Sequence, residues 1–89
     1  MTRRHVVWPT EAREQLDAIA KADSHAVDLI LPAVYALGHD PYPPDSSILG
    51  SSGTYRRLHL GYYRITYAVL DEQIRVVLIA RATGLTDVY

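Results

Sequence analysis

The sequence predicts a two-layer α+β domain, in which an N-terminal strand and a helical hairpin pack on an antiparallel sheet in the order βααβββ. Two observations lead to this class. Apolar residues recur at helical spacing between residues 10 and 37, whereas residues 54–81 alternate between apolar and polar as strands do. Because each element has one apolar face to bury, we expect the helices to cover one face of the sheet and to leave the other open.

The chain begins with a short apolar run, His5-Val6-Val7-Trp8, which Pro9 ends and which suits a strand. Thr10 is then expected to cap a helix over residues 10–21, because a threonine hydroxyl can accept a hydrogen bond from an unpaired amide of the first turn. Acidic residues follow in that turn, where the helix dipole favours negative charge. This segment therefore predicts an amphipathic helix.

A second helix is expected to begin at Ser24, as its cap, and to end at Gly38. Pro32 lies inside it and is expected to kink or divide it, because proline removes one helical hydrogen bond. The connection between the two helices is short, so they should form an antiparallel hairpin.

Residues 39–47 contain three prolines and several turn formers, so we expect a loop without regular structure there. The segment Ser51-Ser52-Gly53 indicates a turn. The expected strands are residues 54–60, 63–70 and 74–81, with turns at 61–62 and 71–73. Three consecutive strands joined by tight turns predict an antiparallel meander.

Alternation assigns each strand residue to the helix-covered face or to the open face. In the last strand it predicts Ile74, Val76 and Leu78 in the core, and it places Arg75, Val77, Ile79 and Arg81 outward. The charged and aromatic residues expected together on the open face are Tyr55, Arg57, His59, Arg64 and Arg81. Arginines without neighbouring carboxylates suit a phosphate backbone, although exposed strands also carry arginine and threonine simply for solubility.

Composition is consistent with one domain over residues 1–89, with 48% hydrophobic residues and no cysteine. Residues 1–53 hold four basic and seven acidic residues, whereas residues 54–81 hold five arginines and two acids. This asymmetry points to an anionic partner, although short segments also differ by a few charges by chance. No signal peptide or membrane span is expected, which favours a cytoplasmic protein. The four histidines have no metal-ligand spacing, so neither a metal nor another cofactor is expected.

The second half of the chain resembles the RelE/ParE superfamily of toxins from bacterial toxin–antitoxin pairs. The matching features are Tyr55 with Arg57-Leu58, Gly61 leading into Tyr63-Arg64-Ile65 and Tyr67, the acidic turn Asp71-Glu72, and the closing Asp87-Val88-Tyr89. The N-terminal strand and the two helices also fit the layout of the family. The resemblance implies a toxin that a cognate antitoxin neutralises, with a toxin–antitoxin hetero-oligomer as a possible assembly.

In the RelE branch, the resemblance implies cleavage of mRNA on the ribosome without a metal, which inhibits translation. It implies a catalytic set of Arg57, His59, Arg64, Arg81 and Tyr89, and further RNA or phosphate contacts from Tyr55, Arg56 and Arg75. Histidine changes protonation near neutral pH, so His59 suits proton transfer. The same superfamily contains the ParE branch, which acts on DNA gyrase. A gyrase inhibitor and a catalytically degenerate binding protein are therefore the alternatives.

Overall fold

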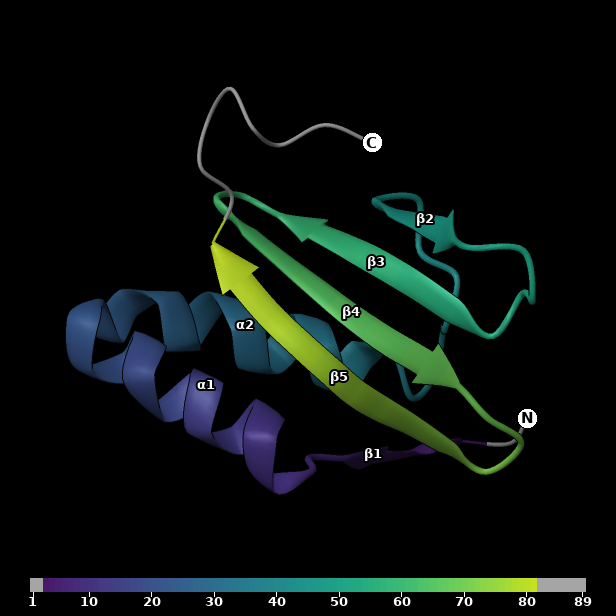
Figure 1. Cartoon of the computed structure of the whole chain (residues 1–89), viewed down its shortest axis with the longest axis horizontal. Coiled ribbons are helices and arrows are strands. Elements are labelled where there is room, and N and C mark those ends of the chain that lie inside the picture. Colours follow the sequence, from purple (N-terminus) through teal and green to yellow (C-terminus); the bar gives the residue numbers. More distant parts are fainter. Residues whose placement is uncertain (1–2, 82–89) are drawn as a thin grey trace.

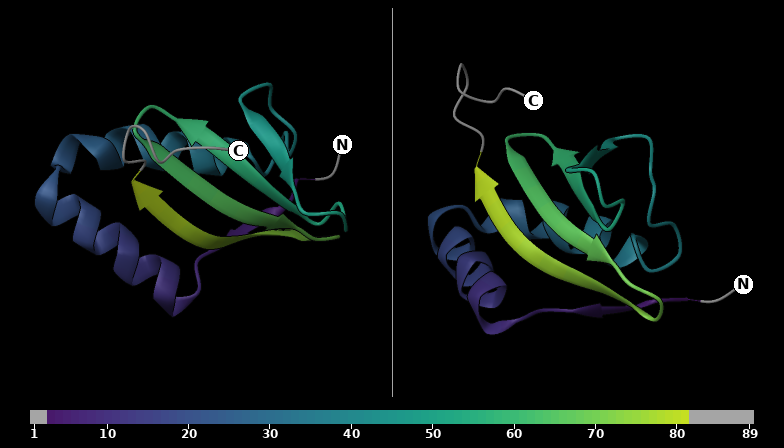
Figure 2. Two further views of the ribbon diagram at one scale, coloured as in Figure 1. Left: turned by 45° about the horizontal axis from the view of Figure 1, so that its top comes forward. Right: turned by 45° about the vertical axis from the view of Figure 1, so that its right-hand side comes forward.

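The computed structural model describes residues 3–81, in which two helices pack on one face of a five-stranded sheet (Figures 1 and 2). The elements in chain order are β1 (His5–Val7), α1 (Thr10–Ala22), α2 (Ser24–Ala36), β2 (Ser46–Leu49), β3 (Tyr55–Leu60), β4 (Tyr63–Val69) and β5 (Gln73–Arg81). The α+β class and the predicted helical hairpin are confirmed. In the described part of the chain, no helix is long and apolar enough to cross a membrane.

The strands lie in the order β1-β5-β4-β3-β2. The meander of β3, β4 and β5 is antiparallel, as expected, and β1 adds to the edge of β5 in parallel. The sheet is therefore mixed and not wholly antiparallel. The short loop from β1 into α1 leads the chain back over the sheet, so the first helix lies along β5 (Figure 1).

One strand was not expected. Ser46–Leu49 forms β2 and pairs antiparallel with β3, although the proline-rich sequence before it predicted a loop through residue 47. Four residues are enough for an edge strand, because the neighbouring strand supplies the hydrogen bonds that a free segment lacks. Gly50 and Gly53 both adopt a φ of 80°, which lets the chain turn tightly from β2 into β3.

The helix ends differ slightly from expectation. Thr10 and Ser24 are each the first helical residue, and the residues before them, Pro9 and Asp23, make no side-chain capping bond. Pro32 does not divide α2, which runs unbroken from Ser24 to Ala36. Its ring is exposed, so water can hydrate the carbonyl group that it leaves without a helical partner.

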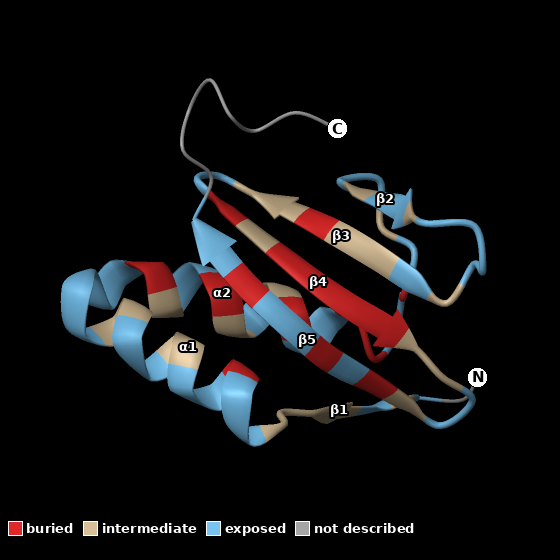
Figure 3. Cartoon of the chain, in the orientation of Figure 1, coloured by how far each residue is buried: buried red, intermediate tan, exposed pale blue. Residues whose placement is uncertain are grey.

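The core lies between the helices and the sheet, and it is densest along β4 (Figure 3). Its largest fully buried side chains are Tyr67, Ile30, Leu37, Ile65, Ile74, Val34 and Val76. Both faces of β4 are buried at its centre, since Thr66 and Ala68 on the open face are only 8% and 4% exposed. These small residues lie between larger side chains of β3 and β5, which shield them.

A β-bulge in β5 changes which residues face the core. Thr66 pairs with Leu78 but the next residue, Tyr67, pairs with Val76, so Val77 is an extra residue without a partner. The extra residue reverses the alternation that follows it. Ile79 is consequently buried at 4% exposure and Leu78 is exposed at 43%, so the expected faces of these two residues were wrong.

Candidate nucleic-acid interface

The centre of the candidate site is a pair of residues on the open face of the sheet. His59 on β3 lies directly opposite Arg64 on β4, and Arg57 lies opposite Thr66 one row further along. Residues directly opposite each other in an antiparallel pair have Cβ atoms roughly 5 Å apart, so their side chains share one surface. The structure therefore brings Arg57, His59 and Arg64 onto the same face, as alternation predicted.

Arg64 is held by the turn that precedes it. Its Nη1 donates to the carbonyl oxygens of Gly61 at 2.8 Å and Tyr63 at 2.9 Å. Gly61 makes this possible, because its φ of 59° is a conformation that glycine adopts without strain. Two bonds from one nitrogen fix the plane of the guanidinium group, so a cationic group of defined orientation stands on the open face.

His59 is held by the edge strand that the sequence did not predict. Its Nε2 lies 3.1 Å from the hydroxyl oxygen of Ser47, within hydrogen-bond distance. Its backbone amide donates to the carbonyl oxygen of Asp45 at 2.9 Å. Ser47 is a functional candidate that the sequence analysis missed, because only the pairing of β2 with β3 brings it beside the histidine.

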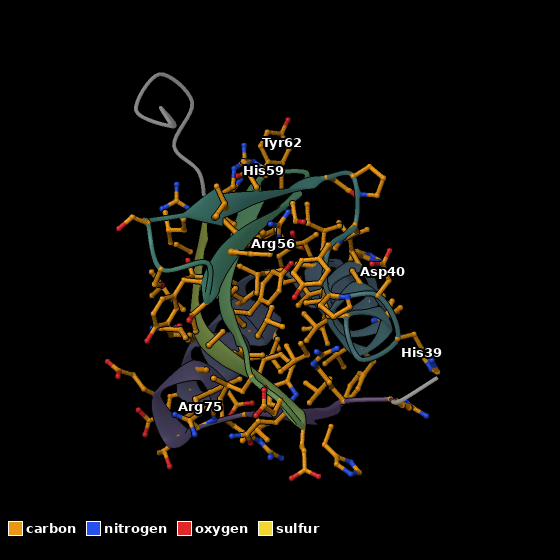
Figure 4. The ribbon with its side chains drawn as sticks, turned by 90° about the vertical axis from the view of Figure 1, so that its right-hand side faces the viewer. His39, Asp40, Arg56, His59, Tyr62 and Arg75 are labelled. Atoms are coloured by element: carbon orange, nitrogen blue, oxygen red, sulfur yellow. The ribbon has the colours of Figure 1, made fainter. Side chains whose placement is uncertain are left out.

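Tyr55 and Arg75 lie on the same open face, further from this centre. Both pair across the sheet with Ala68, Tyr55 from β3 and Arg75 from β5. Tyr55 is 45% exposed. Figure 4 shows Arg75 near the opposite end of the sheet from His59. The aromatic ring of Tyr55 and a third guanidinium group, that of Arg75, thus extend the open face away from the histidine.

Arg56 lies on the other face. Its Nη2 donates to the Ser46 hydroxyl at 2.9 Å, and its guanidinium group stacks 5.2 Å from the centre of the Tyr42 ring. The neighbouring Tyr67 hydroxyl donates to the Pro41 carbonyl at 2.6 Å, and burial raises the pKa of Tyr67. These contacts connect the proline-rich loop to the sheet. Because Arg56 pairs with the core residue Tyr67, it points to the helix side and does not belong to the open-face surface (Figure 4).

Two further residues, Arg81 and Tyr89, were expected to be catalytic. Arg81 pairs with Tyr63, whose side chain faces the helices, so the bulge moves Arg81 off the open face where alternation had placed it. Its guanidinium group lies 5.7 Å from the centre of the Tyr62 ring. Tyr89 lies outside the described residues. Within residues 3–81, no group of three or more histidine and carboxylate side chains could hold a metal ion.

Comparisons with solved structures give the same fold. The YoeB/ParE toxin from Agrobacterium tumefaciens matches with a TM-score of 0.75 at 14% identity, over 89% of this chain and 99% of that one. The chain has the fold of the RelE/ParE toxins. In the RelBE2 toxin–antitoxin complex from Mycobacterium tuberculosis, the match has a TM-score of 0.74 at 17% identity, over 90% of this chain and 99% of that one.

A YoeB–YefM complex from Staphylococcus aureus also matches, with a TM-score of 0.70 at 15% identity, over 92% of this chain and 100% of that one. The RelE/ParE fold is therefore present nearly in full. No protein-family model and no curated protein matches the sequence. At these identities the likeness concerns the fold, and the function has to be argued from the residues of the open face.

Proposed function

We propose that the chain is the toxin of a type II toxin–antitoxin pair and that it cleaves mRNA on the ribosome without a metal ion. The observation that carries the proposal is the pairing of His59 with Arg64 on an open sheet face, with Arg57 in the next row. Cleavage of a phosphodiester requires a base, an acid and cations, and this surface supplies one proton-transfer group beside two cations. The fold shared with RelE/ParE toxins supports the same proposal.

The reaction proceeds by attack of a ribose 2′-hydroxyl on the adjacent phosphorus atom. The new 2′-O–P bond forms while the bond from phosphorus to the 5′-oxygen breaks. A base takes the proton of the 2′-hydroxyl, and an acid gives a proton to the leaving 5′-oxygen. Arg64 and Arg57 stabilise the additional negative charge on the pentacoordinate phosphate. His59 or Tyr89 transfers a proton.

The outer part of the open face binds the RNA strand. Tyr55 is half exposed and offers its ring to an unstacked base, because every base presents a π-face to an aromatic side chain. Arg75 contacts a phosphate further along the strand. Arg56 and Arg81 are left out of this surface, because the strand register places them on the helix side of the sheet.

The proposed protein partner is a cognate antitoxin. The matching structures include toxin–antitoxin complexes, among them RelBE2 and YoeB with YefM. The antitoxin would prevent toxicity by covering the open face or by holding the chain away from the ribosome. Co-expression of the two proteins should yield a stable hetero-oligomer.

A reconstituted translation reaction tests the proposal. The purified chain is added with and without ribosomes, in the presence of a chelator that leaves enough magnesium for translation, and mRNA 5′ ends are mapped. Cuts within codons that require the ribosome, and that disappear when Arg64 is replaced by alanine, are expected. Intact mRNA with continued translation would contradict the proposal, and a gyrase supercoiling assay would then separate a gyrase inhibitor from a binding protein.

A further inference from the structure

The edge strand β2 places a hydroxyl group next to the imidazole of His59. Ser47 pairs with Arg57 in the β2–β3 register, and His59 follows Arg57 by two residues on the same face. Diagonal neighbours of this kind lie roughly 7–8 Å apart at their Cα atoms, a span that a serine and a histidine side chain bridge together. The observed distance of 3.1 Å between Ser47 Oγ and His59 Nε2 follows from this register.

Two contacts that do not involve its side chain hold the segment directly before Ser47. The His59 amide donates to the Asp45 carbonyl at 2.9 Å. Next to it, the Ser46 hydroxyl accepts from Arg56 at 2.9 Å on the opposite face of the sheet. Because β2 is anchored around it, the Ser47 hydroxyl is a defined partner for the imidazole and not one of many mobile surface groups.

A hydrogen bond at Nε2 has two consequences for a proton-transfer histidine. It restricts rotation of the ring about its side-chain bonds, and it biases which of the two ring nitrogens carries the proton in the neutral form. Among residues 3–81, the strand register brings two charged side chains beside the ring on this face, Arg64 opposite it and Arg57 in the next row. Neither arginine can accept a hydrogen bond from the ring, whereas a hydroxyl group can donate or accept.

We propose that Ser47 is a positioning residue that orients the His59 imidazole on the open face, a role that rests on the proposed nuclease function. Ser47 acts through His59 and does not contact the reacting phosphate. Loss of its hydroxyl therefore slows the chemical step without weakening RNA binding. Replacement by threonine, which keeps the hydroxyl group and suits a strand, preserves the role.

The first test is independent of activity. Nitrogen-15 NMR of the imidazole side chains in the purified chain reports how the proton is shared between Nδ1 and Nε2 of His59. We expect the Ser47→Ala variant to change this ratio and the Ser47→Thr variant to keep it. Ser51→Ala serves as the control, because Ser51 is an exposed serine in the turn between β2 and β3. An unchanged ratio in Ser47→Ala would overturn the proposal.

The second test measures single-turnover cleavage of ribosome-bound mRNA at varied ribosome concentration. We expect Ser47→Ala to lower the maximal rate by roughly 10-fold, the scale of one lost neutral hydrogen bond, with an unchanged half-saturating concentration. Ser47→Thr should retain most of the rate. A higher half-saturating concentration at full maximal rate would show that Ser47 binds RNA directly and would contradict the positioning role.

The two tests separate the inference from the proposed function. A wild-type chain that cleaves no mRNA contradicts the nuclease function, and the imidazole signals then decide by themselves whether Ser47 orients His59. A wild-type chain that cleaves, with Ser47→Ala as active as the control, contradicts only the positioning role. Circular dichroism of each variant verifies that the fold is retained.

Discussion

His59 and Arg64 face each other across β3 and β4, separated along the chain only by the hairpin that joins the two strands. Leu60 and Tyr63 are the last pair before the two-residue turn of Gly61 and Tyr62. The site is thus built on a local hairpin whose register the turn sets. The Gly61 carbonyl of the same turn accepts a hydrogen bond from the Arg64 side chain. An imidazole and a guanidinium group are therefore brought together without any distant segment.

Replacing Arg64 by alanine should remove toxicity and leave the fold intact. In the proposed reaction Arg64 stabilises charge that develops in the transition state, and loss of one such donor typically costs about 10²- to 10³-fold in rate. We expect cleavage in the reconstituted reaction to fall by this factor, and cells that express the variant to grow normally. Growth curves and single-turnover rates measure the two effects.

Arg13→Ala is the matched control for this variant, because it removes the same charge from the exposed surface of α1. Its cleavage rate should equal that of the wild-type chain. If both variants lost activity equally, net charge and not the open face would explain the effect. A loss of secondary structure in Arg64→Ala by circular dichroism would contradict the assignment of Arg64 to a solvent-facing position.

The bulge at Val77 can be tested with neighbouring substitutions. Ile79 is buried and Leu78 is 43% exposed. Ile79→Ala should therefore lower the free energy of unfolding by about 2–4 kcal/mol, as expected when a large aliphatic side chain is removed from a core. Leu78→Ala should cost less than about 1 kcal/mol. Urea unfolding measures both, and the reverse order would mean that β5 alternates without a bulge.

Tyr67 should make stability depend on pH in the alkaline range. Burial raises the pKa of Tyr67 above its ordinary value of 10.0, so the unfolded chain loses the phenolic proton before the folded chain does. The stability that this pKa difference contributes is fully present below about pH 10, and it is lost as the pH rises through the folded-state pKa. The wild-type chain should therefore lose stability with rising pH more steeply than Tyr67→Phe does.

Below that range, Tyr67→Phe should be less stable by about 1 kcal/mol, because it lacks the hydrogen bond to the Pro41 carbonyl. Tyr62→Phe is the control, since Tyr62 is 72% exposed and its ring remains beside Arg81. Urea unfolding at a series of pH values gives both quantities. If the free energies of unfolding of the wild-type chain and Tyr67→Phe changed with pH in parallel, the raised pKa would be contradicted.

Gln15 protects the edge of β5. Among the described residues, β1 pairs with this edge only as far as Arg75, and the Ile79 amide beyond it donates to Gln15 Oε1 at 2.8 Å. Gln15→Ala should remove the acceptor of the Ile79 amide and expose that amide to water, which should speed its hydrogen exchange roughly 5- to 10-fold. Glu14→Ala, next to it on α1 and exposed, should leave the exchange rate unchanged. Equal rates in both variants would mean that Gln15 does not hold the edge.

Much of the candidate site follows from local pattern. The alternation in Tyr63, Ile65 and Tyr67 assigns the two faces of β4, and the turn at Gly61 sets the register that pairs His59 with Arg64. The helical hairpin follows from apolar spacing in the same way. These features depend on residues close together in the chain, because side-chain direction in a strand or helix is set by its period.

Other features depend on hydrogen bonds between distant segments. The position of β1 beside β5, the strand formed by Ser46–Leu49 and the bulge at Val77 exist only because another strand supplies the pairing. They decide that Ser47 reaches His59 and that Arg81 leaves the open face. The sequence by itself thus determined the two helices, the N-terminal strand, the meander and the central pair of the site, because these depend on local pattern. The pairing of distant strands decided the presence of β2 and which other side chains join that pair.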